Sequence, residues 1–120
     1  MDNITYYESD EFDLDIWKHM HKYNFIFSDA LHEPSALLYE YNMLKQHNLF
    51  DELGFIYCFD DLEPLQTQPM WLAVKHIVND ITNNFNNHTV ILEHLVVNGW
   101  IGQYEFAHNF GVIKVIPKRI

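Results

Sequence analysis

The sequence predicts an α+β domain with about three helices packed on a mainly antiparallel sheet that ends in a C-terminal β-meander. Three segments carry apolar residues at intervals of three or four, the spacing of amphipathic helices. From Thr89 onward the chain is instead rich in β-branched residues and broken by Gly-containing turn signals, a pattern typical of hairpin-linked strands. With 120 residues and no linker-like stretch, we expect a single domain over residues 1–120.

The N-terminal segment predicts a short strand and then the first helix. Ile4–Tyr7 is β-prone, and Ser9 is a good N-cap for a helix whose first turn is acidic, where the helix dipole favours negative charge. The apolar stripe of this helix consists of Phe12, Ile16, Met20 and Tyr23, with Trp17 beside it.

The next segment predicts strand, helix and strand. Asn24–Ser28 has the composition of a short strand, and Pro34 suits the first position of a second helix that continues to about Asn48. Phe55–Phe59 is a compact apolar run, which we interpret as a strand closed by Asp60-Asp61.

A third helix is expected after a surface loop that runs from Glu63 to Pro69. Its apolar positions recur at helical spacing and end before an Asn-rich segment. These positions are Trp71, Val74, Ile77 or Val78, Ile81 and Phe85.

The C-terminal third predicts three strands. Thr89–Val97 is the first, and Asn98-Gly99 is the strongest short hairpin signal in the chain. Trp100–Phe106 would be the return strand, and Asn109–Gly111 would form a second turn before a last strand, Val112–Ile116. A helical interpretation of Val90–Val97 stays open, because Ile91, His94 and Leu95 share a helical face as well.

Charge is distributed very unevenly along the chain. Residues 1–66 contain fourteen of the seventeen acidic residues against three lysines, a net charge of −11, whereas residues 67–120 carry four basic and three acidic residues, a net charge of +1. We therefore expect one strongly negative region, which would attract a cationic protein partner and repel nucleic acid and anionic membranes.

Tyrosines and phenylalanines alternate with these acids, and Tyr and Trp are common anchors at protein interfaces. A surface of this kind predicts a protein-binding site. The residues that we predict to contact the partner are Tyr7, Glu8, Asp10, Glu11, Asp13, Asp15, Glu40, Asp51, Glu52, Asp60, Asp61 and Glu63.

Catalytic and metal-binding signatures are weak, so we expect no enzyme, no metal site and no cofactor. His76 and Asp80 share a helical face, but zinc needs three or four ligands. Cys58, the single cysteine, lies in an apolar run and is interpreted as a buried, inert thiol; the alternative is a small enzyme centred on it. The acidic N-terminus is unlike a secretory signal, which favours a cytoplasmic protein.

In size, acidity and the mixing of acids with aromatics, the chain resembles bacterial immunity proteins of contact-dependent inhibition and colicin-type systems. The segments that carry the resemblance are Glu8–Asp15, Phe50–Glu52 and Asp60–Glu63. The resemblance implies an antitoxin that binds a cognate toxin domain, often a cationic nuclease, and occludes its active or substrate-binding site. The alternative is a phage-encoded acidic inhibitor that mimics DNA and blocks a host defence nuclease.

Overall fold

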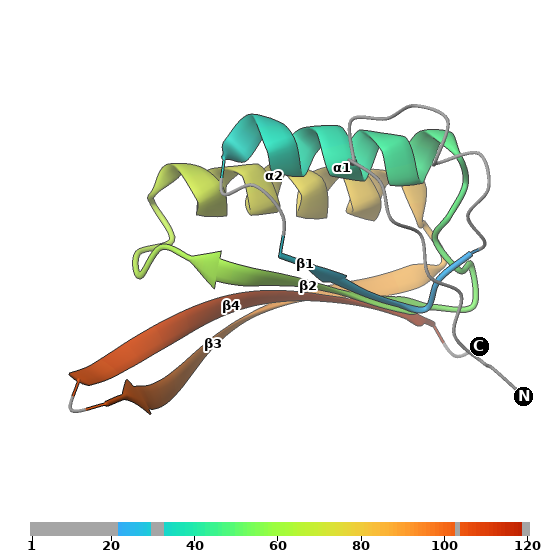
Figure 1. The fold of residues 1–120 in the computed structure, drawn as a ribbon. Coiled ribbons are helices and arrows are strands. Elements are labelled where there is room, and N and C mark those ends of the chain that lie inside the picture. The colour runs from blue at the N-terminus through green and yellow to red at the C-terminus, as the bar shows by residue number, and fades with distance from the viewer. Residues whose placement is uncertain (1–21, 30–32, 103, 119–120) are drawn as a thin grey trace, which may run out of the picture.

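Two helices lie side by side on one face of a four-stranded sheet in the computed structural model, which describes residues 22–29, 33–102 and 104–118 (Figure 1). The elements are β1 (Phe25–Ser28), α1 (Pro34–Gln46), β2 (Phe55–Leu62), α2 (Pro69–Asn84), β3 (His88–Ile101) and β4 (Tyr104–Pro117). This is an α+β architecture, but the expectation of about three helices is wrong, because the described residues form two. The predicted strand Ile4–Tyr7, and the predicted first helix up to residue 21, lie outside the described residues.

The four elements expected between Asn24 and Asn84 are present, but β2 continues through Asp60-Asp61, where the predicted strand ends, to Leu62. The sheet that they help to form is mixed. β1 and β2 run parallel, with Phe25 opposite Ile56 and Ser28 opposite Phe59. A parallel pair needs a crossover, which α1 supplies. The strand order is β1-β2-β4-β3, and the other two pairings are antiparallel.

The predicted C-terminal meander is wrong, because residues 88–117 form one long hairpin. β3 and β4 have 14 residues each and pair without interruption from His88↔Pro117 to Ile101↔Tyr104. The helical alternative for Val90–Val97 is excluded, since these residues belong to β3. The turn contains Gly102, whose φ of 60° favours glycine.

Neither predicted turn forms. Gly99 and Gly111 lie within strands, where the lack of a side chain leaves room for a neighbouring side chain. Asn98-Gly99 lies inside β3 and Asn109–Gly111 inside β4. A Cβ on Gly99 would come within 2.7 Å of the Phe106 ring, and one on Gly111 within 2.7 Å of the Leu62 side chain. In these strands glycine marks a close approach of side chain to backbone.

The core lies between the helices and the inner face of the sheet. α2 contributes its apolar stripe, in which Trp71, Val74 and Ile77 are fully buried. β2 contributes Phe55, Tyr57 and Phe59, which alternate with residues that face away from the helices.

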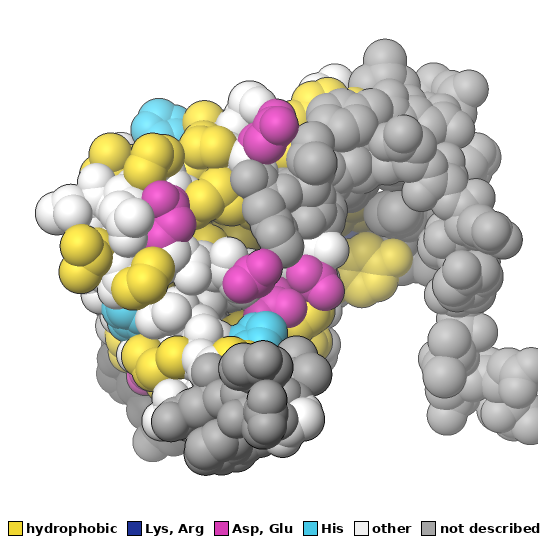
Figure 2. All heavy atoms as spheres, turned by 60° about the vertical axis from the view of Figure 1, so that its left-hand side comes forward, with side chains coloured by type: hydrophobic (Ala, Val, Ile, Leu, Met, Phe, Trp, Pro, Cys, Tyr) yellow, Lys and Arg dark blue, Asp and Glu magenta, His cyan; other side chains and the backbone are white. Residues whose placement is uncertain are grey.

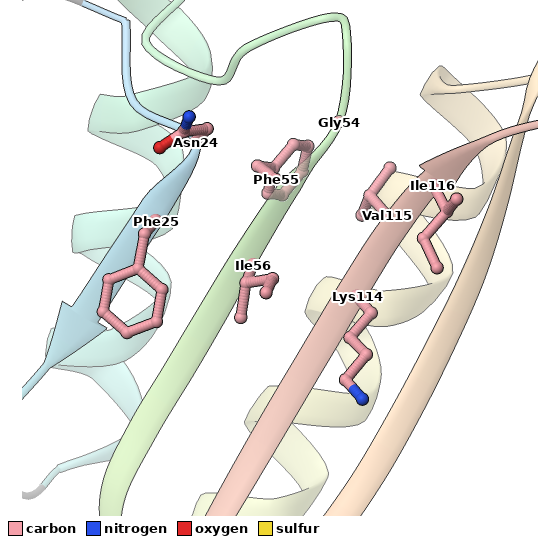
Figure 3. A pocket seen from close by; sticks show the side chains of 8 residues that line it. All are labelled: Asn24, Phe25, Gly54, Phe55, Ile56, Lys114, Val115 and Ile116. Atoms are coloured by element: carbon pink, nitrogen blue, oxygen red, sulfur yellow. The ribbon is translucent and has the colours of Figure 1, made fainter.

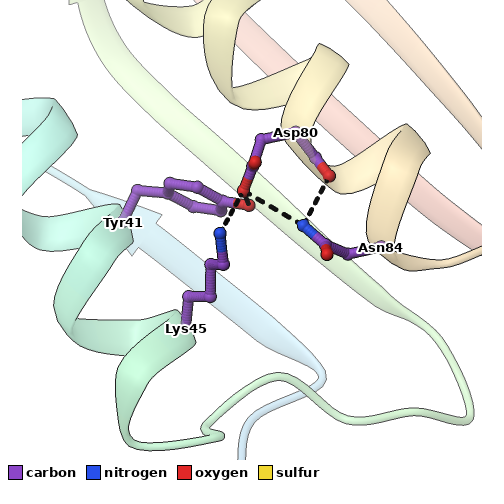
Figure 4. Close-up of polar contacts among 4 residues, drawn as sticks. All are labelled: Tyr41, Lys45, Asp80 and Asn84. Carbon is purple, nitrogen blue, oxygen red and sulfur yellow. Dashed lines mark hydrogen bonds and ion pairs between the residues drawn. The ribbon is translucent and has the colours of Figure 1, made fainter.

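A polar network of side chains joins the two helices (Figure 4). Tyr41 donates its hydroxyl hydrogen to Asp80 Oδ2 over 2.5 Å, and Lys45 Nζ donates to the same oxygen over 2.8 Å. The Lys45 and Tyr41 hydrogen bonds hold the pKa of Asp80 below its usual value. Burial, together with the bond to Asp80, raises the pKa of Tyr41 far above its usual value of 10.0.

This network predicts a loss of stability at alkaline pH that depends on Tyr41. Folding raises the pKa of Tyr41, so its contribution to the free energy of unfolding is complete below pH 10. Above pH 10 this contribution declines, because the tyrosine ionises in the unfolded chain and not in the folded one. The free energy of unfolding, measured by urea denaturation between pH 8 and 11, should fall more steeply for the wild type than for Tyr41→Phe. Parallel curves would show that Tyr41 makes no such contribution.

Candidate functional site

A β-bulge in β2 presents the acidic pair Asp60-Asp61. Between the pairs Phe59↔Gly111 and Leu62↔Asn109, β2 advances three residues while β4 advances two. The extra residue returns Leu62 to the core, where it is 4% exposed. Asp61 takes a φ of 56°, a left-handed conformation that Asp tolerates better than most residues. The bulge therefore places both acids at the end of β2, with Asp61 exposed and Asp60 largely enclosed, while Leu62 stays in the core.

Further acidic residues gather at this end of the sheet. Because Ser28 pairs with Phe59, Asp29 lies next to the bulge. Figure 1 shows that α1 begins on the side of the molecule where β2 ends, so Glu33, directly before α1, lies on that side in the helix layer. Glu63 follows β2 directly. Figure 2 views the molecule from this side and shows acidic side chains grouped near the middle, with hydrophobic side chains around them. We call Asp29, Glu33, Asp60, Asp61 and Glu63 the acidic end.

Glu63 also anchors the loop that leads into α2. Its Oε1 accepts a hydrogen bond from the Met70 backbone N–H at 2.6 Å, and its carbonyl oxygen accepts one from Trp71 Nε1 at 2.7 Å. A carboxylate at a helix N-terminus is electrostatically favourable. Glu63 is thus partly structural, so Asp60 and Asp61 are better candidates for partner contact.

The structure separates the predicted site residues into distinct places. Asp51 and Glu52 precede β2, and the five residue steps from Phe55 to Asp60 put the start of the strand about 17 Å from the bulge. Glu52 is paired with Lys22 at 2.5 Å, and the hydrogen bond from Lys22 lowers the pKa of Glu52. Glu40 is only 8% exposed, and its carboxylate accepts hydrogen bonds from the Ser28 and Tyr57 hydroxyls inside the molecule. Of the predicted contact acids among the described residues, the structure therefore brings only Asp60, Asp61 and Glu63 together at the acidic end.

The remaining predicted contact residues lie in the part of the chain that the structure leaves undescribed. They are Tyr7, Glu8, Asp10, Glu11, Asp13 and Asp15.

The sheet face that points away from the helices is unusually apolar for an exposed surface. It carries large hydrophobic side chains that are between 36% and 57% exposed. They come from all four strands: Phe25, Phe27, Ile56, Ile91, Leu95, Val97 and Ile116. We call this surface the outer face; the Lys114–Glu93 ion pair lies among these side chains. Exposed apolar patches often mark sites of interaction in soluble proteins.

Sequence reasoning did not identify the outer face, although β2 carries a signal for it. Ile56 and Cys58 lie between the core residues Phe55, Tyr57 and Phe59, so both faces of this strand are apolar. A strand that is apolar on both sides is normally covered on both sides. Here the described helices cover one side, which makes the other a candidate binding surface.

Two hollows lie on the outer face, one toward each end of β2. The first holds about 400 Å³ near the start of the strand and is lined by side chains from β1, β2 and β4, among them Phe25, Ile56 and Lys114 (Figure 3). Lys114 pairs with Glu93 at 3.0 Å, so its charge is already compensated. The second holds about 390 Å³ beside Asp60.

Cys58 opens partly onto the outer face, which corrects its interpretation as a buried thiol. Partial burial and the nearby charge of Asp60 raise the pKa of the Cys58 thiol, so the protonated form is favoured. A protonated thiol is a poor nucleophile and a poor metal ligand. Among the described residues, no three His, Cys, Asp or Glu side chains come together as a metal ion would require.

Neither α1 nor α2, the helices of the described residues, is long and apolar enough to cross a membrane. No protein-family model matches the chain, and no curated protein matches its sequence.

Proposed function

We propose that this protein is a bacterial immunity protein, an antitoxin that binds a cognate toxin domain and neutralises it. The main observation in support of this proposal is that the acidic end adjoins an exposed apolar sheet face. An apolar centre with a charged rim is the usual anatomy of a specific protein interface. The carboxylates would steer a cationic domain to the surface, and the apolar side chains would hold it there.

The expected partner is a cationic nuclease domain. Such a domain binds phosphates through lysine and arginine side chains, which carboxylates can also satisfy. The antitoxin would occupy the active or substrate-binding site of the nuclease in the bacterial cytoplasm, stoichiometrically and without turnover. No enzyme activity and no cofactor are required of the antitoxin itself.

The role requires a surface that spans both the outer face and the acidic end. A typical stable complex buries about 800 Å² on each partner. That is close to a tenth of the 8188 Å² of accessible surface of this chain. The outer face and the acidic end are contiguous at Phe27 and Asp60, which line the same hollow, so one partner can cover both.

The test is a growth assay in bacteria. The C-terminal domain encoded by the adjacent upstream gene is induced with and without this protein. We expect growth to arrest with the toxin domain alone and to recover when this protein is co-expressed. A variant in which Phe27 and Val97 are both replaced by Ser should relieve the arrest poorly, because both side chains are about half exposed on the outer face.

Arrest that wild-type protein does not relieve would contradict cognate immunity. The same physics would then favour the phage-encoded inhibitor, which binding to a purified host defence nuclease would reveal. A control for the general loss of exposed apolar surface is Leu72→Ser, since that leucine is 55% exposed on α2, which packs on the opposite face of the sheet.

A further inference from the structure

The hollow beside Asp60 combines aromatic walls with a carboxylate. Its volume of about 390 Å³ is sufficient for one long side chain. The walls are Phe27 from β1, Val97 from β3, and Phe106 and Phe110 from β4, while Asp60 and His108 supply the polar groups.

The β4 wall is a row of three rings on alternate residues of one strand. The Phe106 and His108 ring centroids are 4.7 Å apart at an interplanar angle of 75°, and those of His108 and Phe110 are 6.1 Å apart at 20°. The Phe106 ring lies against the backbone of Gly99, where a Cβ would collide with it. The shape of the hollow is thus maintained by packing in the β3–β4 hairpin.

The negative charge of the Asp60 carboxylate is largely enclosed, but few donors or cations among the described residues lie near it. The side chain is 16% exposed, and Oδ1 is sealed from solvent and accepts no hydrogen bond from any described residue. The nearest cationic candidate among them is His108, whose Nδ1 lies 3.8 Å from Oδ1, beyond hydrogen-bond range. Enclosed carboxylates are normally satisfied by donors, and a charged donor is the most effective.

We infer that this hollow binds a cationic side chain, an arginine or a lysine, of the partner protein. The aliphatic stem would lie between the phenylalanines and the charged head would face the rings. A head-group N–H would donate to the Asp60 carboxylate after a rotation of that side chain opens Oδ1 to the hollow. Cations are attracted to aromatic faces, and this attraction grows when water is excluded. A neutral apolar side chain would leave the carboxylate uncompensated, and an anion would be repelled. The inference rests on the proposed function for the identity of the partner but can be tested without it.

The experiment uses capped amino acids as probes of the wild-type protein at neutral pH. N-acetyl-arginine methylamide, the lysine analogue and the neutral citrulline analogue are titrated while backbone amide shifts are followed by NMR. We expect saturable shifts at Asp60, His108 and Phe110 with the arginine or lysine probe. Binding of the citrulline probe, which has nearly the same shape as arginine but no charge, should be at least about tenfold weaker.

Two variants separate the hollow from the general negative field. Asp60→Asn should weaken arginine binding about tenfold, whereas Asp61→Asn makes the same charge change on a neighbouring residue outside the hollow and should change it less than about twofold. Gly99→Val keeps the charge and displaces Phe106, so it should also weaken binding. Dispersed amide spectra would establish that each variant is folded.

Several outcomes would overturn the inference. They are equal affinity for the arginine and citrulline probes, equal losses in Asp60→Asn and Asp61→Asn, and the absence of saturable shifts in the folded wild type. None of these would prevent the wild-type protein from relieving toxin arrest in the growth assay, so failure of this inference is distinguishable from failure of the proposed function.

Discussion

Exchanging Asp60 for lysine and Asp61 for asparagine is expected to slow association with the toxin domain about a hundredfold at low salt. Complementary charges raise association rate constants by two to three orders of magnitude above those of neutral partners, about 10⁵ to 10⁶ M⁻¹s⁻¹. The Asp60→Lys/Asp61→Asn variant changes the charge of the acidic end by three. Asn is chosen at position 61 because the φ of 56° there suits Asn and disfavours lysine. Stopped-flow fluorescence or surface plasmon resonance would measure the association rate constant.

The matched control is Asp51→Asn/Glu52→Lys, which makes the same charge change at the other end of β2. If recognition takes place at the acidic end, this control should slow association less than about threefold, and the difference between the variants should shrink as salt is raised. Equal effects of the two variants would contradict the assignment of the binding surface to the acidic end. Loss of Lys22 pairing in the control is not a concern, since an exposed ion pair contributes little to stability.

The helix and strand positions between residues 24 and 85 were predictable because their signals are local. Pro34 begins α1 as predicted, because the fixed φ of proline favours the first position of a helix. Pro69, which the sequence placed at the end of the loop, begins α2 in the same way. The apolar stripe of α2 recurs at helical spacing, and Phe55–Phe59 is too short and too apolar for anything but a strand or a buried helix segment.

The hairpin was predicted wrongly because glycine occurs both in tight turns and in strands where a neighbouring group approaches the backbone closely. The sequence alone does not distinguish these two roles. Asn98-Gly99 has the composition of a tight turn, yet Gly99 lies opposite Phe106, whose ring occupies the space of a side chain. Gly111 likewise makes room for Leu62 and Trp71. The Gly99 contact lies within the β3–β4 hairpin, whereas the Gly111 contacts join β4 to β2 and α2, which are far apart in sequence. At both positions packing overrides the local turn signal.

The candidate site was predictable in its chemistry and not in its geometry. Asp60 and Asp61 were identified from charge, and the bulge that presents them depends on the register of β2 against β4. Glu40 was grouped with them because it lies between two tyrosines, but its helix position turns it inward toward Tyr57. The phenylalanines of the outer face gave no separate signal, because a sequence does not show which of two apolar strand faces the helices cover.

Replacing Trp71 by alanine is expected to destabilise the protein by about 3–5 kcal/mol, the usual cost of deleting a large buried aromatic side chain. Trp71 is fully buried, contacts Gly111 of β4, and lies 4.4 Å from the His94 ring of β3. A domain of this size is stable by about 5–15 kcal/mol in total, so Trp71→Ala would remove a large share. Urea denaturation followed by circular dichroism would measure the change.

Trp71→Phe distinguishes lost volume from the lost hydrogen bond to the Glu63 carbonyl. It keeps much of the ring but removes the indole N–H, which donates over 2.7 Å. We expect a smaller loss, about 1–3 kcal/mol, from the remaining cavity and the unsatisfied carbonyl. Because that carbonyl belongs to the loop behind the acidic end, Trp71→Phe should also broaden the amide signals of residues 63–68. A loss below about 1 kcal/mol for Trp71→Ala would contradict the central position of this side chain in the core.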